Sequence, residues 1–278
     1  IAKFRAARRI WARWLRERYG ASSQRALRLR FHTQTAGVSL TAQQPVNNVV
    51  RTAIEALAAV LGGTNSLHTN ALDETLALPT DEAAQTALRT QQVILEETGV
   101  ANVADPLGGS WYVEALTDRL EAEAEAIFDQ ILAMGAAESA GERHQIGPMT
   151  SGILRGIEDG WFSAEIAEAA FGYQQAVEKG RKKIVGVNCH TSTVAPDLTI
   201  LRVSDEVERE QRDILARRRA QRDPAGVDAA LARMVGDARS SANLVPAMLD
   251  AARAEATLGE ICDALRGIWG TYREPARF

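Results

Sequence analysis

The stretch SLHTNALDE, residues 66–74, has the length of a β-strand followed by a loop, and it lies between two amphipathic helical runs. A strand in that position fits a parallel sheet covered by helices, where both faces are buried and Val, Ile and Leu predominate. Ser66, His68 and Asn70 instead alternate with less polar residues, so one face of the strand carries hydrogen-bonding side chains. Such a face needs polar partners in the interior of the protein.

The same pattern of a short strand followed by a helix occurs three times. The strand-like runs are RFHTQTAG (30–37), SLHTNALDE (66–74) and ANVADPLGGS (101–110), and the helical runs that follow them span 45–63, 81–98 and 113–134. Their regular spacing fits one strand, one helix and two loops per repeat. We therefore predict three consecutive βα units.

Consecutive βα units build either a doubly wound sheet or a (β/α)8 barrel. The barrel is favoured because no glycine-rich G-x-G-x-x-G loop follows a strand. The predicted fold class is α/β: the C-terminal part of a (β/α)8 TIM barrel, with about three βα units, followed by a mostly helical extension. We expect residues 1–138 to form the barrel part and residues 139–278 to form the extension, which contacts other subunits.

The remaining runs are mainly helical. We predict a surface helix with a solvated basic face at 1–19, a helical stretch at 150–180 and a salt-bridged helix at 204–224. A Thr257-x-x-Glu260 capping box opens the last helix. Two short β-like runs, KKIVGVNCHT (182–191) and DLTILRVS (197–204), lie between them.

Composition excludes several classes of protein. The net charge of −4 gives no basic excess for nucleic acid, and no apolar run has the length of a membrane span. Cys189 and Cys262 lack metal-ligand or disulfide spacing, so we expect a reducing, cytoplasmic location. The sequence opens at Ile1 already in helical phase and without a capping residue, so we expect it to be the C-terminal part of a longer protein.

The polar strand faces predict a ligand channel. Alternation places His32 and Gln34 on one face of the first strand, as it does Ser66 and His68 on the second. No Asp, Glu or Cys completes a metal-ligand set on these faces, and no nucleophile elbow surrounds the serine. Taken alone, either histidine fits a hydrogen-bonded core residue better than a metal ligand. Together the faces fit a channel for a long, amide-bearing ligand.

Three residues follow the carboxyl ends of the strands, where barrel enzymes keep their active sites. Asp73 and Glu74 come after the second strand, and spacing alone supports helix capping and a site role equally. Gly37 occupies the matching position after the first strand and permits the backbone to approach a flat ligand closely.

At these residues the sequence resembles a known family. The segments FHTQTAGVSLTAQQPVNNVVRTAIEALAAVLGGTNSLHTNALDETLALPTDEAA, EETGVANVADPLGGSWYVE and, more loosely, ATLGEICDALRGIWG are similar to the adenosylcobalamin-dependent acyl-CoA mutases, of which methylmalonyl-CoA mutase is the best-known member. Within that family, IGPMTSGILRGIEDGWFSAEIAEAAFGYQ and the ending YREPARF most resemble the large subunit of isobutyryl-CoA mutase. The resemblance covers essentially the whole chain.

The resemblance implies a barrel threaded by the pantetheine arm of a CoA ester, with adenosylcobalamin across its C-terminal rim. No D-x-H-x-x-G cobalt-ligand motif occurs here, so a separate small subunit is expected to supply the cobalt ligand, and no metal ligand is expected in this chain. The implied cofactor-binding residues are Gly37, Glu74, Ala77, Asn70 and Gln34, the implied substrate-binding residues are Gln34, Asn65, Ser66 and His68, and the implied catalytic residues are Glu74 and His32.

The implied activity is a radical carbon-skeleton isomerisation of isobutyryl-CoA to n-butyryl-CoA. This sequence has Val38 where methylmalonyl-CoA mutase has an aromatic residue, and Asn65 where that enzyme has glutamine. Methylmalonyl-CoA and 2-hydroxyisobutyryl-CoA stay open as alternative substrates. The expected partners are the acyl-CoA, the small cobalamin-binding subunit and the remainder of the large subunit, with a G-protein chaperone left open. The rival interpretation is a non-catalytic fragment that acts only in subunit interaction.

Overall fold

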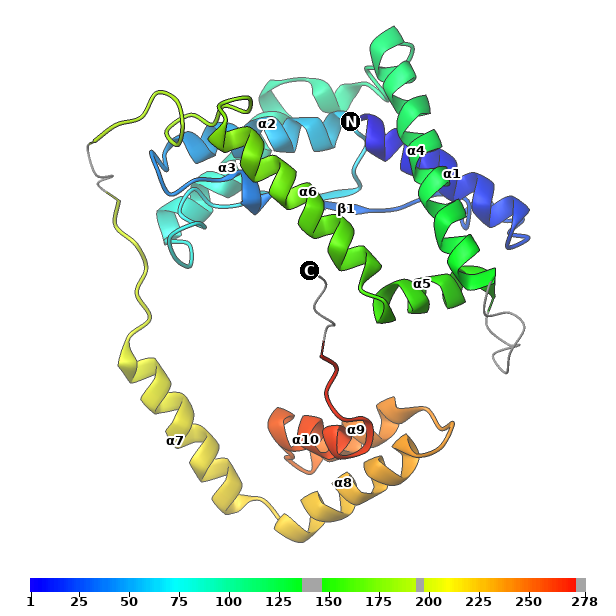
Figure 1. The fold of residues 1–278 in the computed structure, drawn as a ribbon. Helices are drawn as coiled ribbons and strands as arrows, with labels where there is room; N and C mark the ends of the chain where they lie inside the picture. The colour runs from blue at the N-terminus through cyan, green and yellow to red at the C-terminus, as the bar shows by residue number, and fades with distance from the viewer. Residues whose placement is uncertain (137–146, 194–197, 274–278) are drawn as a thin grey trace. The chain divides into compact units, whose positions relative to one another are not determined.

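The computed structural model describes residues 1–136, 147–193 and 198–273 (Figure 1). Contacts between Cα atoms divide the chain into two compact units, residues 1–202 (unit 1) and residues 203–275 (unit 2). Both units are mainly helical, and within the described residues the strands lie in unit 1. The predicted boundary between residues 138 and 139 lies outside the described residues and stays a prediction.

Unit 1 contains two parallel strands joined by a helical crossover. Strand β1 (His32–Gln34) is followed by α2 (Asn47–Leu61), β2 (Ser66–His68) and α3 (Asp81–Glu97). The strands pair with His32 opposite Ser66 and Gln34 opposite His68. Parallel strands need such a crossover, and the helical run that forms α2 provides it. The structure therefore contains a parallel strand pair with the predicted helix after each strand, while the βα units of a barrel stay a prediction.

The third predicted strand is wrong. Residues Val100–Asn102 form a 3-10 turn (η2), and the chain then turns at Asp105 and Gly109, whose φ angles are +47° and +79°. Left-handed φ values at two positions of this short segment are incompatible with an extended strand. The helix predicted after it does form, as α4 (Trp111–Ala136).

Helix α1 (Ala2–Glu17) lies alongside α4 (Figure 1). Its predicted basic face is only partly in solvent, because the arginines of α1 pair with acidic residues before and along α4. The pairs are Arg5 with Asp105 and Glu114, Arg9 with Asp118 and Glu121, and Arg13 with Glu121 and Glu125. The acidic residues of α4 recur at helical spacing, so they form one face opposite the arginines.

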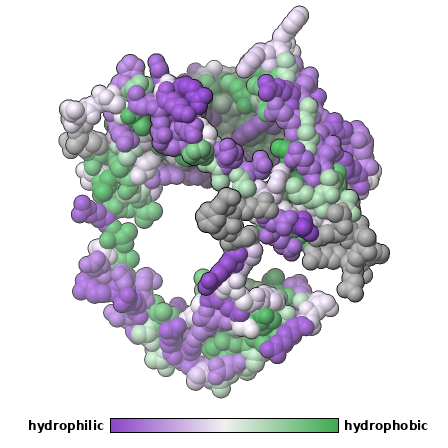
Figure 2. Space-filling view, viewed as in Figure 1, coloured by the Kyte–Doolittle hydropathy of each residue, from purple (hydrophilic) through white to green (hydrophobic). Residues whose placement is uncertain are grey.

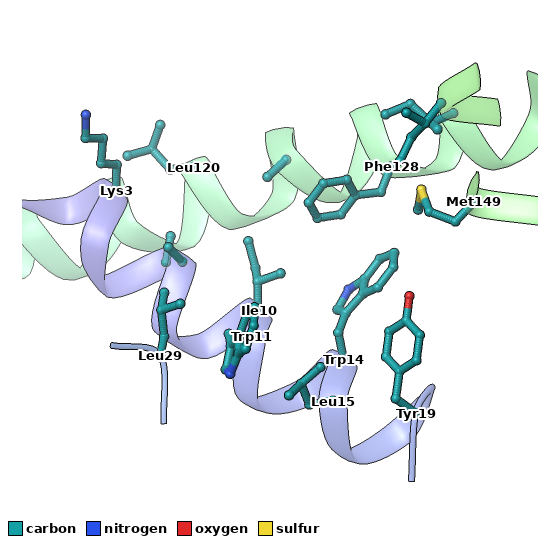
Figure 3. A pocket seen from close by; sticks show the side chains of 15 residues that line it. Lys3, Ile10, Trp11, Trp14, Leu15, Tyr19, Leu29, Leu120, Phe128 and Met149 are labelled. Carbon is teal, nitrogen blue, oxygen red and sulfur yellow. The ribbon is translucent and has the colours of Figure 1, made fainter. Parts of the chain in front are cut away.

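An apolar pocket of about 660 Å³ lies between α1, α4 and α5 (Figure 3). Trp14 of α1 meets Phe128 of α4 edge to face, with ring centroids 4.9 Å apart, and Met149 of α5 lies on the same side of the pocket. The pocket is lined almost entirely by hydrophobic side chains.

The helical stretch predicted at 150–180 divides into α5 (Pro148–Glu158) and α6 (Trp161–Glu178). Gly160, at φ +66°, produces the break. The β-like run at 182–191 instead forms a tight turn, in which the Asn188 side chain donates to the carbonyl oxygens of Val177 and Lys182. Residues 198–203 of the second β-like run form neither helix nor strand.

Unit 2 consists of α7 (Asp205–Gln221), α8 (Pro224–Ala238), α9 (Leu244–Arg253) and α10 (Leu258–Trp269). Helices α8, α9 and α10 enclose an apolar core of Met234, Ala247, Ala251 and Ile261. The predicted capping box of Thr257 and Glu260 is confirmed. Other apolar side chains stay at the surface of both units (green in Figure 2).

Candidate functional site

The polar side chains predicted on the two strands lie side by side on one exposed face. His32 Nδ1 is 2.7 Å from Ser66 Oγ, and Gln34 Nε2 donates to Asn70 Oδ1 at 3.3 Å. His68 lies opposite Gln34 in the register and is exposed as well. The alternation read from the sequence therefore places these side chains on a common face.

The residues predicted at the carboxyl ends of the strands also come together. A Cβ atom at Gly37 would lie 3.0 Å from Glu74 Oε1 and 3.1 Å from Asn70 Nδ2. Asn70 is only 2 % exposed, and its Nδ2 has no hydrogen-bond partner among the described residues. Glu74 is exposed. We call Gly37, Asn70 and Glu74 the rim cluster.

A pocket of about 570 Å³ lies beside the rim cluster. Its lining includes Gln34, His68, Glu74 and Ala77, all predicted site residues, together with Gln91 of α3. The pocket therefore joins the polar strand face to the loop that follows β2.

Asn65, in contrast, lies at the amino ends of the strands, away from the rim cluster. Its Oδ1 accepts from Phe31 N and its own N–H donates to Phe31 O, both at 3.1 Å. A second pocket of about 640 Å³ there is lined by Asn65 and by the side chains of Arg8, Arg28 and Arg30. This end of the strands is therefore basic, whereas the rim end carries carboxylates.

Two loops form the rim: residues 35–46 after β1 (rim loop 1) and residues 69–80 after β2 (rim loop 2). Asn48 of α2 is fully buried and joins them. Its Nδ2 donates to Thr41 O and Leu72 O, both at 2.9 Å, and its Oδ1 accepts from Thr41 N at 3.1 Å. Sequence reasoning missed Asn48, which lies in the first turn of α2.

Rim loop 1 has two further supports that the sequence did not reveal. Glu55 of α2 accepts from Ala36 N at 2.7 Å and from the Ser39 hydroxyl. The segment after α6 docks on this loop and on α2, because Gln44 of the loop donates to His190 O and Arg51 of α2 donates to Val185 O, both at 2.8 Å. Contacts from distant parts of unit 1 thus hold the loop that carries Gly37.

Rim loop 2 closes on itself. Asp73 Oδ2 accepts from Thr80 N at 2.9 Å and from Thr80 Oγ1 at 3.2 Å, and Thr80 in turn caps α3. The sequence left open which role each of the two adjacent carboxylates has. In the structure Asp73 supports the start of α3, while Glu74 faces Gly37.

Other types of site find less support in the described residues. They hold no group of three or more His, Cys, Asp or Glu side chains that could bind a metal ion. None of their helices combines the length and apolarity needed to cross a membrane. The apolar pocket between α1, α4 and α5 contains none of the predicted site residues.

Comparison with known proteins matches the whole chain to one family. The family described as methylmalonyl-CoA mutase matches residues 1–271. The chain is 44 % identical to the 2-hydroxyisobutanoyl-CoA mutase large subunit of Aquincola tertiaricarbonis, over 100 % of this chain and 47 % of that protein. It is 43 % identical to the methylmalonyl-CoA mutase of Escherichia coli (strain K12), over 100 % of this chain and 37 % of that protein.

The chain is also 40 % identical to the probable mitochondrial methylmalonyl-CoA mutase of Caenorhabditis elegans, over 98 % of this chain and 34 % of that protein. It therefore spans between about a third and about half of the length of these relatives. The family match includes both strands, both rim loops and most of unit 2. The chain belongs to the methylmalonyl-CoA mutase family.

Proposed function

We propose that this chain is part of the large, substrate-binding subunit of an adenosylcobalamin-dependent acyl-CoA mutase. The observation that carries the proposal is the rim cluster at the carboxyl ends of two parallel strands, next to a face of polar side chains. In parallel α/β folds, ligands bind at the carboxyl ends of the strands. The family to which the chain belongs gives this site its chemistry.

The rim cluster fits the adenosyl part of the cofactor. Gly37 has no side chain, so its backbone is open to a flat ring, and any Cβ there would press on Glu74 and Asn70. The exposed Glu74 carboxylate accepts hydrogen bonds, and the unpaired Asn70 Nδ2 donates one, which suits ribose hydroxyl groups. When bound, adenosylcobalamin supplies the radical chemistry, while these residues orient the ligand.

The polar strand face fits the pantetheine arm of a CoA ester. His32, Gln34, Ser66 and His68 offer donors and acceptors along the strands, as the two amides of the arm require. The arginine-lined pocket at the amino ends suits the phosphate groups of the CoA, since guanidinium groups bind phosphate in bidentate fashion. In this arrangement the acyl group lies at the rim, and His32 and Gln34 hold the thioester in register.

For the substrate we favour isobutyryl-CoA, which is converted to n-butyryl-CoA. The likeness of residues 146–174 to isobutyryl-CoA mutases supports it, as does the small residue Val38, which is 95 % exposed beside Gly37. The relative named 2-hydroxyisobutanoyl-CoA mutase large subunit makes 2-hydroxyisobutyryl-CoA the second candidate. The small cobalamin-binding subunit, the remainder of the large subunit and a G-protein chaperone are the partners of this proposal.

The test is substitution of Glu74 in the assembled mutase. Glu74→Gln and Glu74→Ala should each lower turnover by about 10- to 100-fold, because a hydrogen bond to a charged group contributes roughly 1.5–3 kcal/mol. The KM for the acyl-CoA should stay the same, since Glu74 faces the cofactor. Turnover is measured with isobutyryl-CoA, 2-hydroxyisobutyryl-CoA and methylmalonyl-CoA in parallel.

Glu82→Ala is the matched control, because Glu82 is an exposed carboxylate in the first turn of α3, just after rim loop 2. It should leave turnover unchanged. Normal turnover of both Glu74 variants with all three esters would remove the proposed role. Absence of any mutase activity in the wild-type assembly would favour the non-catalytic alternative.

A further inference from the structure

We propose that Asp73 is a positioning residue, which closes rim loop 2 and thereby holds Glu74 against Gly37. This inference rests on the proposed function and goes beyond it, because it assigns a role to a buried carboxylate that contacts neither substrate nor cofactor in that scheme. The inference starts from the hydrogen bonds between Asp73 and Thr80.

Asp73 closes the loop with its side chain and with its backbone. Oδ2 accepts from both the N–H and the hydroxyl of Thr80, at 2.9 and 3.2 Å. The carbonyl oxygen of Asp73 accepts from Leu76 N at 2.8 Å and from Ala77 N at 3.1 Å. The turn that carries Glu74 and Ala77 is therefore fixed at its start by Asp73, and its two ends are joined by the same residue.

Apart from these bonds and one from Glu74 N to Ala71 O at 3.3 Å, burial also singles out Asp73. Asp73 is 1 % exposed and is the only buried residue between positions 73 and 80, where most other side chains face solvent. The residue before it, Leu72, is held through its carbonyl oxygen by Asn48 Nδ2 at 2.9 Å. The start of rim loop 2 is thus held by hydrogen bonds, and the position of the rest of the loop depends on the bridge between Asp73 and Thr80.

The position of Glu74 relative to Gly37 depends on the bridge between Asp73 and Thr80. Glu74 Oε1 lies 3.0 Å from the position that a Cβ at Gly37 would take, so the two rim loops leave no room for a side chain between them. A ligand-binding group must be held within about 0.5 Å of its productive position. Loss of the bridge leaves Glu74 on a solvated turn and removes that constraint.

A double-mutant cycle in the assembled mutase tests the proposal. Asp73→Ala should lower turnover by roughly tenfold with an unchanged KM for the acyl-CoA, as Glu74→Ala does. If Asp73 acts only through Glu74, the Asp73→Ala/Glu74→Ala double variant should be no slower than Glu74→Ala alone, because the two changes remove the same contribution. Asp73→Asn keeps an oxygen for both Thr80 donors and should restore most of the turnover.

Asp223→Ala is the matched control. Asp223 is also an aspartate that supports the start of a helix, since its Oδ1 accepts from Ala225 N at 3.1 Å, but the helix that it caps is α8 of unit 2. It should lower the melting temperature without lowering turnover, so a general loss of stability is separated from loss of positioning.

Normal turnover of Asp73→Ala would overturn the inference, and so would a double variant whose loss of turnover equals the product of the two single losses. In either case a loss of turnover in Glu74→Ala would still support the proposed function. An inert Glu74→Ala would instead contradict the proposed function itself. Should Asp73→Ala fail to fold, Thr80→Val removes the hydroxyl bond to Asp73 together with the cap on Ala83 N, and Thr80→Ser retains both. Turnover that falls in the valine variant and returns in the serine variant supports the inference, and equal turnover in both contradicts it.

Discussion

The two units of the molecule bury different kinds of side chain. In unit 1 the fully buried residues include Asn48, Thr52, Asn70 and Asp73, which hydrogen-bond across loops and helices. In unit 2 every buried residue within the described range 203–273 is apolar, and the core is centred on Met234. Both units consist mainly of helices, so the helices themselves do not account for the difference.

The difference follows from what each interior has to specify. Apolar packing is non-directional and tolerates small adjustments of helix position, whereas a hydrogen bond fixes the direction of approach of both partners. In unit 1 the bonds of Asn48 and Asp73 end on the backbone of the rim loops. The polar interior therefore determines the positions of loops, and the apolar interior determines only that helices pack.

Among substitutions that test the difference between the two interiors, removal of the Asn48 side chain should have the largest effect on stability. Asn48→Ala leaves Thr41 N, Thr41 O and Leu72 O without their partner, and we expect it to destabilise unit 1 by roughly 4 kcal/mol, because each unpaired buried group is costly. Hydrogen exchange measured by mass spectrometry should rise in both rim loops and stay unchanged in α8–α10.

Asn47→Ala is the control for this prediction. The neighbouring Asn47 is half-buried and donates to Gln44 Oε1 at 3.1 Å within the same turn. Its loss should cost less than about 1 kcal/mol. Equal exchange rates in the Asn47 and Asn48 variants would contradict the assigned role of the buried amide.

Removal of the Met234 side chain tests the apolar interior of unit 2 in the same way. Met234 is completely buried between α8, α9 and α10, and Met234→Ala should destabilise unit 2 by about 3 kcal/mol through lost burial and a residual cavity. Met234→Leu, which conserves volume, should cost less than about 1.5 kcal/mol. Exchange should rise in α8–α10 while the rim loops remain protected. A rise of equal size in the rim loops would show that the two units unfold together.

Sequence periodicity predicted much of this structure. The apolar period placed α2, α3 and α4, and strand alternation placed His32, Gln34, Ser66 and His68 on one face. Local motifs were equally informative, as the capping box of Thr257 and Glu260 shows. These signals depend on residues close in the chain, where the spacing alone decides which side chains meet.

Periodicity failed where backbone conformation or distant contacts decide. The third strand was wrong because Asp105 adopts a positive φ, which few non-glycine residues do. The basic face of α1 was expected in solvent because its acidic partners lie more than a hundred residues away, as with Arg13 and Glu125. The strand pattern placed Gly37 and Glu74 after the strand ends, and the resemblance to a family gave them their roles. The hydrogen bonds of Asn48 and Asp73 became visible only in three dimensions.

The smallest expected effect concerns an ion pair at the edge of the unit 2 core. The Arg222 guanidinium, and then the Thr257 backbone N–H, hold the pKa of Glu260 well below its usual range. A depressed carboxyl pKa contributes stability that is present above the unfolded value of about 4.3 and is lost as the pH falls toward the folded value. Glu260→Gln should therefore lower the melting temperature of unit 2 at pH 7, and the difference from wild type should narrow below about pH 4.

Scanning calorimetry of both proteins from pH 7 down to pH 2.5, with Asp263→Asn as a control, checks this prediction. Asp263 pairs with Arg266 three residues away, and both side chains are largely exposed, so that variant should follow wild type. The Glu260 effect should stay below that of Met234→Ala, since Glu260 also remains in part accessible to solvent. A melting-temperature difference that is constant across the pH range would mean that Glu260 acts through the shape of its capping box. In that case even this charged contact would serve packing, and the contrast between the two units would become stronger.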